Sequence, residues 1–344
     1  MRPAAKYFLI LSLLFICRNG YAQAGQVPDS IDDYMIRIYH DNDFISYRGK
    51  ATDEAYTGGI RADFFFTKKK PYRFIIDRLF PKAGDQAVNI FQWGFMQVVY
   101  TPRDIEDSAY QPNDYAFSAG LYIIHSLYSY DPVKKFSFQT EIKLGVMGPA
   151  ALGEQSQELI HRVMGYETPN GWKNQLNTDV LFNVNFTAEK QFLSLGQFAE
   201  LTGGSKISAG TLVNAVSVYP LIRIGWMNPY FDGYISQYAG PGHAGSSRIR
   251  KFQFYLFAKP SINWVLTNAM LEGGFFSDHS RKVDGKLIQY QTYHSIEHLV
   301  YQADFGAVLN NEHFSISFDQ NISSMLIKNT YSHEYGNVSI YFTW

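Results

Sequence analysis

The chain ends on GNVSIYFTW, residues 336–344, in which every second side chain is apolar. The apolar positions are Val338, Ile340, Phe342 and Trp344, and they alternate with Ser339, Tyr341 and Thr343. Because successive side chains of a β-strand point to opposite faces, this pattern predicts a strand with one apolar face that ends on an aromatic residue. An ordinary strand of a soluble β-sandwich would show the same alternation, so the rest of the chain has to decide between the two.

The opposite end of the chain has the pattern of a secretory signal. Arg2 and Lys6 precede an apolar run over residues 8–17, and the small residues Ala22 and Ala24 follow it. The run is shorter than the roughly 20 residues that a membrane-spanning helix needs, which disfavours an N-terminal anchor. We therefore expect residues 1–24 to be a cleaved signal peptide and residues 25–344 to form one barrel domain. The single cysteine lies within the signal, which excludes disulfides, thiolate nucleophiles and cysteine zinc sites from the mature chain.

The composition favours a protein of the outer membrane. Aromatic residues make up 17% of the chain, an excess that suits the aromatic girdles of barrels at the two bilayer interfaces. No stretch after the signal resembles a transmembrane helix, and a chain that spans lipid without helices must close into a barrel, because lipid cannot satisfy open backbone groups. We therefore predict an all-β, transmembrane antiparallel β-barrel in a Gram-negative outer membrane. The net charge of −1 gives no electrostatic basis for binding nucleic acid.

Alternating segments recur along the chain. In one of them Ile60 and Phe64 alternate with Arg61 and Asp63, which predicts a lipid-facing side and a polar lumen. A coarse count gives about twelve strands, an even number as bacterial barrels require. They lie near 33–43, 56–67, 88–101, 114–130, 135–148, 179–200, 207–226, 251–263, 265–276, 297–309, 312–322 and 335–344.

Strand parity orients the loops. If the N-terminus starts in the periplasm, the loops after odd strands are extracellular, and most of them are longer than the turns between. These loops are 44–55, 102–113, 149–178, 227–250, 277–296 and 323–334. A longer periplasmic connection, 68–87, has the character of a short amphipathic segment at the inner rim.

The loop 149–178 predicts a short extracellular helix between Pro149 and Gly165. One stripe of this helix is apolar, and another is polar with a spacing of i, i+3 and i+7. The apolar stripe holds Leu152, Leu159 and Val163, and the polar stripe holds Glu154, Gln157 and His161. Gln157 and His161 are four residues apart, so their side chains point the same way.

Strand parity brings three polar groups together at the outer rim. The helix is one, Asp41-Asn42-Asp43 at the top of the first strand is another, and Tyr56-Thr57 at the start of the second strand is the third. A histidine beside carboxylates and amides is a workable general base, and Asp and Asn oxygens suit a hard cation such as calcium. A solvated histidine and ordinary turn residues would give the same pattern. The sequence contains neither a calcium loop of EF-hand spacing nor a G-x-S-x-G nucleophile elbow.

At these residues the sequence resembles the outer-membrane lipid A 3′-O-deacylase family, LpxR. The likeness is specific over about residues 33–180. The segments that carry it are Asp41-Asn42-Asp43, Tyr56-Thr57-Gly58-Gly59, Tyr100-Thr101-Pro102, Asp114-Tyr115-Ala116, Gly148-Pro149 with Gln157-x-x-x-His161, and Asn170-Gly171-Trp172 with Gln175-Leu176. Asp41 stands where the family usually has Glu, and Gly58 stands where it usually has Asn.

The resemblance implies a twelve-stranded barrel that hydrolyses the ester-linked 3′ acyl chains of lipid A in lipopolysaccharide. It also implies Ca²⁺ as a cofactor and a mechanism similar to that of phospholipase A2. His161 would be the general base that activates a water, and Gln157, Asn42, Asp43 and Thr57 would complete the catalytic site, with Asp43 and Asn42 as metal ligands. Outer-membrane lipids are the expected surroundings, and we expect a monomer.

Two other functions fit the same pattern. An outer-membrane phospholipase could use the same residues on glycerophospholipid. A non-enzymatic barrel, such as a pore or an adhesin, would also explain the polar lumen face that Arg37, Arg61 and Asp63 indicate. In a regular strand Asn42 and Asp43 face opposite ways, so both can serve one site only if the strand end bends.

Overall fold

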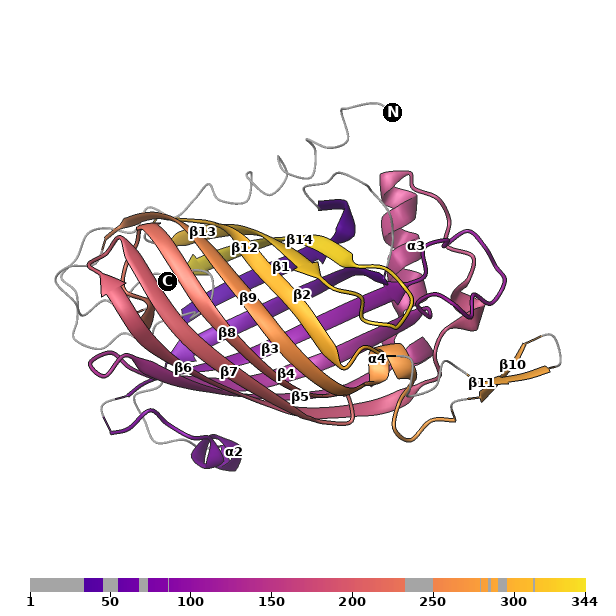
Figure 1. The fold of residues 1–344 in the computed structure, drawn as a ribbon, viewed down its shortest axis with the longest axis horizontal. Coiled ribbons are helices and arrows are strands. Elements are labelled where there is room, and N and C mark those ends of the chain that lie inside the picture. The colour runs from indigo at the N-terminus through magenta and orange to yellow at the C-terminus, as the bar shows by residue number, and fades with distance from the viewer. Residues whose placement is uncertain are drawn as a thin grey trace.

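The chain forms a closed, twelve-stranded antiparallel barrel in a computed structural model (Figure 1). The structure describes residues 34–45, 55–67, 74–85, 87–232, 250–278, 280–283, 286–289, 296–311 and 313–344, so the predicted signal peptide lies outside the described residues. The barrel strands are β1 Tyr34–Asn42, β2 Ala55–Thr67, β3 Val88–Thr101, β4 Ser118–Asp131, β5 Phe136–Met147, β6 Asp179–Leu195, β7 Ala199–Gly210, β8 Val213–Trp226, β9 Phe252–Asn268, β12 Leu299–Asn311, β13 Phe314–Ser323 and β14 His333–Thr343.

The terminal alternating segment closes the barrel. β14 pairs with β13 on one side and with β1 on the other, where Ile340 lies opposite Ile38 and Phe342 opposite Ile36. The predicted fold class and strand number are therefore confirmed. No helix within the described ranges is long and apolar enough to span a bilayer.

Short helices and one hairpin decorate the two ends of the barrel. They are η1 Asp43–Ile45, α2 Ile75–Leu79, η2 Gly148–Ala151, α3 Gly153–Met164, η3 Trp172–Asn174, η4 Tyr230–Asp232, α4 Ala269–Glu272, and the hairpin of β10 Ser280–Val283 with β11 Lys286–Gln289. Figure 1 places α3, α4 and this hairpin at one end, which we call the α3 end, and α2 outside the wall towards the other end.

The middle of the predicted strand list was wrong. The predicted strands 179–200 and 207–226 are three strands, β6, β7 and β8, with tight turns at Gly196 and at Thr211-Leu212. The predicted strands 251–263 and 265–276 are the single strand β9 followed by α4. Pro260 does not end β9, because it pairs with Ala303 of β12 while the register between β8 and β9 skips residues 259–261.

One error missed a strand and the other added one, so the predicted strand count is unchanged. For the chain between the two errors, however, the predicted strand direction is reversed. Because β8 is an even strand, the chain that leaves it at Met227 lies at the end opposite α3. The prediction that 227–250 belongs with the loop 149–178 was therefore wrong. Of that loop, residues 233–249 lie outside the described residues, and 227–232 fold into the barrel.

The two faces of the wall differ as the alternation predicts. Outward side chains are large, apolar and exposed; among them are Ile38, Ile60, Phe95, Ile123, Leu256 and Phe342. The exposed apolar band that these residues form suits contact with lipid tails.

The lumen is packed rather than open. Away from α3, one apolar cluster joins side chains from opposite walls with the returning segment after β8, and it includes Tyr128, Tyr255, Met227, Tyr230 and Phe231. At the α3 end, a second cluster joins Tyr56 and Tyr122 with Met270 of α4. Filling of this kind is usual for small barrels.

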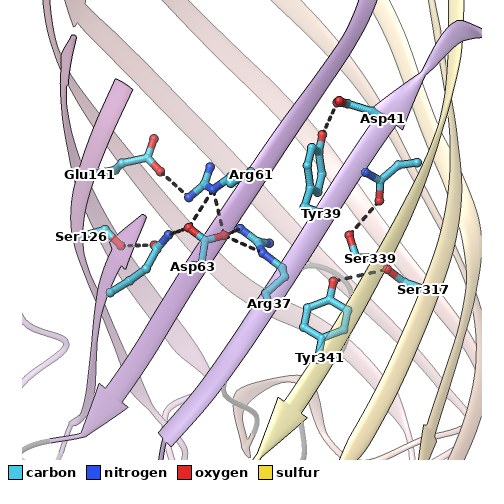
Figure 2. A network of polar contacts seen from close by, with 12 residues as sticks. Arg37, Tyr39, Asp41, Arg61, Asp63, Ser126, Glu141, Ser317, Ser339 and Tyr341 are labelled. Carbon is cyan, nitrogen blue, oxygen red and sulfur yellow. Dashed lines mark hydrogen bonds and ion pairs between the residues drawn. The ribbon is translucent and has the colours of Figure 1, made fainter. Parts of the chain in front are cut away.

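A charged network fills the lumen between these clusters (Figure 2). Asp63 accepts hydrogen bonds from Arg37 and Arg61, at 2.8 and 2.9 Å, and also from the side chain of Gln92. Arg61 reaches Glu141 at 3.3 Å. Buried charges are tolerated when each is paired and hydrogen-bonded, as these are.

Candidate active site

The end of β1 divides the Asp41-Asn42-Asp43 triplet between the two faces of the wall. Asp41 points into the lumen, where its Oδ2 accepts hydrogen bonds from Tyr39 at 2.5 Å and Tyr56 at 2.9 Å. Asn42 lies on the outward face and donates from Nδ2 to the backbone oxygen of Thr57, 3.1 Å away. The triplet therefore does not act as a unit, and Asp41 anchors the strand from inside.

β1 ends at Asn42, and the helix η1 begins at Asp43. This helix packs beside the outward side of β13 and β14, where the backbone oxygen of Ile45 accepts from Gln320 at 3.2 Å. The strand end therefore bends as a shared site requires, and Asn42 and the buried Asp43 are freed from strict alternation.

A bulge at Thr57 brings β2 into the same site. The register between β2 and β3 shifts between Tyr56 and Gly58, so Tyr56 faces the lumen while the hydroxyl of Thr57 lies 2.5 Å from that of Thr101. Bulges of this kind turn a side chain out of its ladder position. The amide of Asn42 thus holds the backbone of Thr57 on the outward face.

Gly58 leaves room for the Asn42 amide. A Cβ at Gly58 would lie 2.9 Å from the backbone oxygen of Asp41 and 3.3 Å from Asn42 Nδ2. Because these approaches are tighter than ordinary contacts, a side chain at position 58 would require a shift at the backbone of Asp41 and an adjustment of the Asn42 amide. The family's usual Asn at this position thus does not fit the arrangement of this chain.

The predicted helix is present, but it begins later than expected. Pro149 lies in the first turn of the short helix η2, and Leu152 then adopts a left-handed conformation with φ of 59° before α3 begins at Gly153. Gly165, with φ of 71°, ends α3, as glycine commonly does at a helix C-terminus.

The polar stripe of α3 faces the protein, and its apolar stripe faces outward. Gln157 and His161 are 4% and 5% exposed, whereas Leu159 and Val163 are 58% and 70% exposed. This is the reverse of a helix packed on a soluble core, where the apolar stripe is the buried one. It is the orientation expected when the outside of the helix meets an apolar medium.

Gln157 is held in place by the indole of Trp172. Trp172 Nε1 donates to Gln157 Oε1 at 2.8 Å, and the indole ring packs on Phe117 at 5.1 Å between centroids. Gln157 Nε2 is buried, and it has no hydrogen-bond partner among the described residues. A buried donor without a partner is uncommon, and it points to a missing ligand or water.

His161 is oriented by a backbone oxygen. Its Nδ1 lies 2.5 Å from the oxygen of Glu167, just beyond the helix end. A carbonyl oxygen only accepts, so Nδ1 carries the proton, which makes Nε2 the basic nitrogen of the neutral ring. The ring also makes an edge contact with Tyr166.

Both halves of the site are attached to the outward face of β3. Thr101 of β3 bonds Thr57, and Gln97 of the same strand donates to the backbone oxygen of Ala151, next to α3, at 2.7 Å. Four strand residues span about 13 Å. The site therefore lies on the outer wall of the barrel, with Asn42 and Thr57 on one side and Gln157 and His161 on the other.

Two loops support α3 from the barrel end. Asn170 donates from its backbone nitrogen to the oxygen of Ile105 at 2.8 Å, and Asn174 Nδ2 donates to the oxygen of Ser108 at 3.0 Å. These bonds join residues 102–117 to 165–178. Between the two loops, the charge of Glu167 raises the pKa of the Glu106 carboxyl above its ordinary value.

The residues at the strand end suit a hard cation in ligand type. The carboxylate of Asp43 and the amide oxygen of Asn42 are the kinds of ligand that Ca²⁺ takes. Across the described ranges, no three His, Cys, Asp or Glu side chains come together as a ready-made metal cage. A cation here would therefore take most of its ligands from backbone oxygens, water or a substrate.

Sequence reasoning assigned no role to Trp172, Thr101 or Gln97. Each acts through a tertiary contact with a predicted site residue or with the start of α3. The signal for two of them was present, because Trp172 and Thr101 lie in the segments that resemble the family.

Comparisons with known proteins identify the family of the chain and support its barrel fold. A family model described as "Outer membrane protein LpxR" matches residues 8–344. Among solved structures, LpxR from Salmonella typhimurium is similar with a TM-score of 0.69 and 18% identity, over 90% of this chain and 99% of that one. The β domain of the Bordetella autotransporter BrkA is similar with a TM-score of 0.44 and 9% identity, over 92% of this chain and 100% of that one. A search of curated proteins found no match.

Proposed function

Because this chain belongs to the LpxR family of outer membrane proteins, we propose that it is an outer-membrane esterase that removes the 3′-linked acyl chains of lipid A. The observation that carries the proposal is the orientation of α3. Its polar residues Gln157 and His161 face the outer barrel wall, while Leu159 and Val163 are exposed beside them. A site on the lipid-facing side of the wall meets membrane lipid directly, without passage through the lumen.

The depth of the site suits the outer leaflet. In the orientation that we propose, the α3 end is extracellular, and the site lies where the apolar wall ends and the loops begin. An ester bond between a sugar headgroup and its acyl chain lies at that same boundary. The exposed apolar residues of α3 would then contact acyl chains while the polar stripe contacts the ester.

His161 is placed to act as the general base. Nε2 takes a proton from a water molecule, whose oxygen attacks the ester carbonyl carbon, and Nδ1 stays bonded to Glu167 as the ring becomes positive. When the intermediate collapses, the C–O bond to the sugar breaks and the proton passes from Nε2 to the sugar oxygen. The products are a free fatty acid and a sugar hydroxyl, so atoms and charges balance.

Gln157 is placed to bind developing charge. Its Oε1 accepts from Trp172, so its Nε2 is fixed in direction, and this buried donor has no partner among the residues that the structure describes. A preorganised donor of this kind stabilises the oxyanion of an acyl transfer. Thr57 and Asn42 hold the facing side of the site through their mutual bond.

A calcium ion held by Asp43 and Asn42 would polarise the ester carbonyl. The residue types fit this role, and the small number of acidic ligands predicts a binding site that a chelator empties easily.

The packing of the lumen favours an enzyme over a pore. The cluster of Tyr128, Tyr255, Tyr230 and Phe231 crosses the barrel interior, so conduction would require these side chains to move. A phospholipase that uses the same site is the competing enzyme, and substrate assays separate it from a lipid A deacylase.

The test is the mass spectrum of lipid A from cells that express the protein. Wild type should show loss of the 3′ acyl mass, and His161→Ala should lower the rate on purified lipid A by about 10²–10⁴-fold, the usual contribution of a general base. A calcium chelator should also lower the rate of lipid A hydrolysis. His298→Ala is the matched control, because Nδ1 of this exposed residue also bonds a backbone oxygen, that of Val265 at 2.7 Å.

The proposal fails if wild type and His161→Ala give the same lipid A spectrum while both are folded in the membrane. Hydrolysis of purified glycerophospholipid without hydrolysis of lipid A would establish the phospholipase instead. Ion conductance in planar bilayers without ester hydrolysis would establish the pore.

A further inference from the structure

A buried His–Asp pair lies on the outside of the barrel, where His125 of β4 lies opposite Trp93 of β3. In β4, Ser126 points into the lumen and bonds Gln92, so the next side chain, that of His125, points outward. His125 Nε2 lies 2.7 Å from Asp77 Oδ1, and Asp77 is completely buried. His125 Nδ1 lies 3.0 Å from the backbone oxygen of Gln92.

Aromatic rings surround this pair. The ring of His125 stacks on Trp93 with 4.3 Å between centroids, and Phe74 and Phe80 pack around it at 6.0 and 5.9 Å. A carboxylate and an imidazole are costly to bury at a lipid-facing wall unless each has a partner. The pair therefore requires a cover, and the segment around α2 provides it.

The segment 74–85 lies along the outside of β3 and β4, towards the end opposite α3 (Figure 1). Phe80 packs with Phe91 and Leu127, two outward residues of the wall. The backbone nitrogen of Ala83 donates to Ser129 Oγ at 2.9 Å. The segment is thus bound to the wall at three points: the Asp77–His125 pair, the Phe80 contact and the Ala83 bond.

The side of this segment that faces away from the barrel is apolar. Ile75 and Leu79 are 75% and 74% exposed, and Phe74 is half-exposed. This surface is continuous with the lipid-facing wall, since Phe74 contacts Trp93 and Ile123 is exposed two residues before His125. Arg78, also exposed, lies between the two aliphatic residues in sequence, and its long stem can carry its charge out towards headgroups.

We propose that the segment 74–85 is a membrane-interface anchor, in which Asp77 and His125 hold α2 against the barrel wall so that Phe74, Ile75 and Leu79 enter the periplasmic leaflet. The partner is the phospholipid surface at the end of the barrel opposite the active site. Short amphipathic segments bind interfaces in this way by burying a few apolar side chains. The anchor is independent of the proposed esterase chemistry.

The test uses spin labels at single cysteines in a Cys17→Ser background, which removes the only native cysteine. Labels at Leu79, Ile123 and Val133 are compared in phospholipid vesicles by their collision with oxygen and with a water-soluble nickel chelate. Ile123 is 57% exposed on the wall, and Val133 is 82% exposed in the β4–β5 turn at the same end as α2. We expect the label at Leu79 to match the lipid-facing Ile123 and to differ from Val133.

The role of the Asp77–His125 pair is tested by Asp77→Ala. Asp85→Ala is the matched control, because Asp85 is an exposed carboxylate of the same segment. Asp77→Ala should move the accessibility at Leu79 to the value at Val133, while the label at Ile123 keeps its value and so shows that the barrel is folded. Asp85→Ala should change neither. If the label at Leu79 has the same accessibility as the label at Val133 in the unaltered protein, the anchor proposal is wrong. If Asp77→Ala leaves the accessibility at Leu79 unchanged, the Asp77–His125 pair does not hold the segment.

Discussion

The lumen and the outer wall at the α3 end both hold buried polar side chains, but they use them differently. In the lumen, Asp63 is bonded by Arg37, Arg61 and Gln92, so its charge is matched on every side (Figure 2). On the outer wall, Gln157 Oε1 accepts from Trp172, and its Nε2 has no partner within the part of the chain that the structure describes. The network around Asp63, which holds more charged groups, therefore stabilises the fold.

This difference separates polar groups that pack the lumen from polar groups that can bind a ligand. A network whose members satisfy one another gains rigidity, but it has no group left to offer a ligand. A fixed donor without a partner costs stability unless something binds it. The Asp63 network is therefore assigned a structural role, and the buried Nε2 of Gln157 is the donor available to a ligand on the outer wall.

Removal of Asp63 should give the largest effect on stability. Asp63→Ala removes the carboxylate that pairs with Arg37 and leaves Arg61 with Glu141, and breaking a buried ion pair from one side typically costs about 3–5 kcal/mol. Urea unfolding followed by tryptophan fluorescence should show this loss, while the folded fraction keeps its specific activity within about twofold. Asp107→Ala, in an exposed loop, is the control. A folded Asp63→Ala protein without esterase activity would place the lumen network in the catalytic machinery.

Two adjacent glycines allow the comparison to be made within one strand. A Cβ at Gly58 would press on the outward Asn42 amide, and a Cβ at Gly59 would lie 2.5 Å from Asp41 Oδ1 in the lumen. Overpacking typically costs about 1–3 kcal/mol. Gly58→Ala should therefore lower kcat/KM more than stability, and Gly59→Ala should lower stability more than kcat/KM. Equal effects of the two substitutions on both quantities would contradict the division of the wall into two roles.

Much of this division could be read from the sequence. Alternation in the last nine residues indicated the barrel, and the i, i+4 spacing of Gln157 and His161 placed them on one face of a helix. The sequence of α3 does not show which stripe faces the protein. The polar stripe faces inward only when the medium outside the helix is apolar. The family resemblance supplied the residues of the site, but the lumen-facing direction of Asp41 required the register of β1 with β2.

The missed strand has a local cause. β7 contains Gly203-Gly204 followed by Ser205-Lys206, which gives weak alternation, and its flanking turns are only two or three residues long. Pro260 has no backbone N–H to donate to a ladder. It is tolerated in β9 because the strand lacks ladder partners on the β8 side at that point.

The hydrogen bond from Trp172 to Gln157 should have an intermediate effect. Trp172→Phe keeps a ring against Phe117 but removes the Nε1 donor, so Gln157 loses its fixed direction. One hydrogen bond contributes about 0.5–1.5 kcal/mol, which corresponds to a fall in kcat of roughly 2- to 10-fold. Trp93→Phe, on the outer wall beside His125, should leave kcat unchanged. An unchanged kcat for Trp172→Phe would mean that catalysis does not depend on the hydrogen bond from Trp172 to Gln157.

The smallest expected effect concerns the pH response of the loops that support α3. The charge of Glu167 raises the pKa of Glu106, so the folded arrangement holds a proton that an unfolded chain would release earlier. For a raised pKa, the stabilisation is complete below the unfolded value, near pH 4.3, and it is lost as the pH rises through the folded value. Hydrogen exchange of the backbone amides of 102–117 and 165–178, corrected for intrinsic rates, should therefore quicken across this window in wild type. Glu106→Gln removes the repulsion and should make the exchange independent of pH there, with esterase activity unchanged. If both proteins respond equally to pH, the loops are held by Asn170 and Asn174 alone, and the carboxyl pair has no influence on the position of His161.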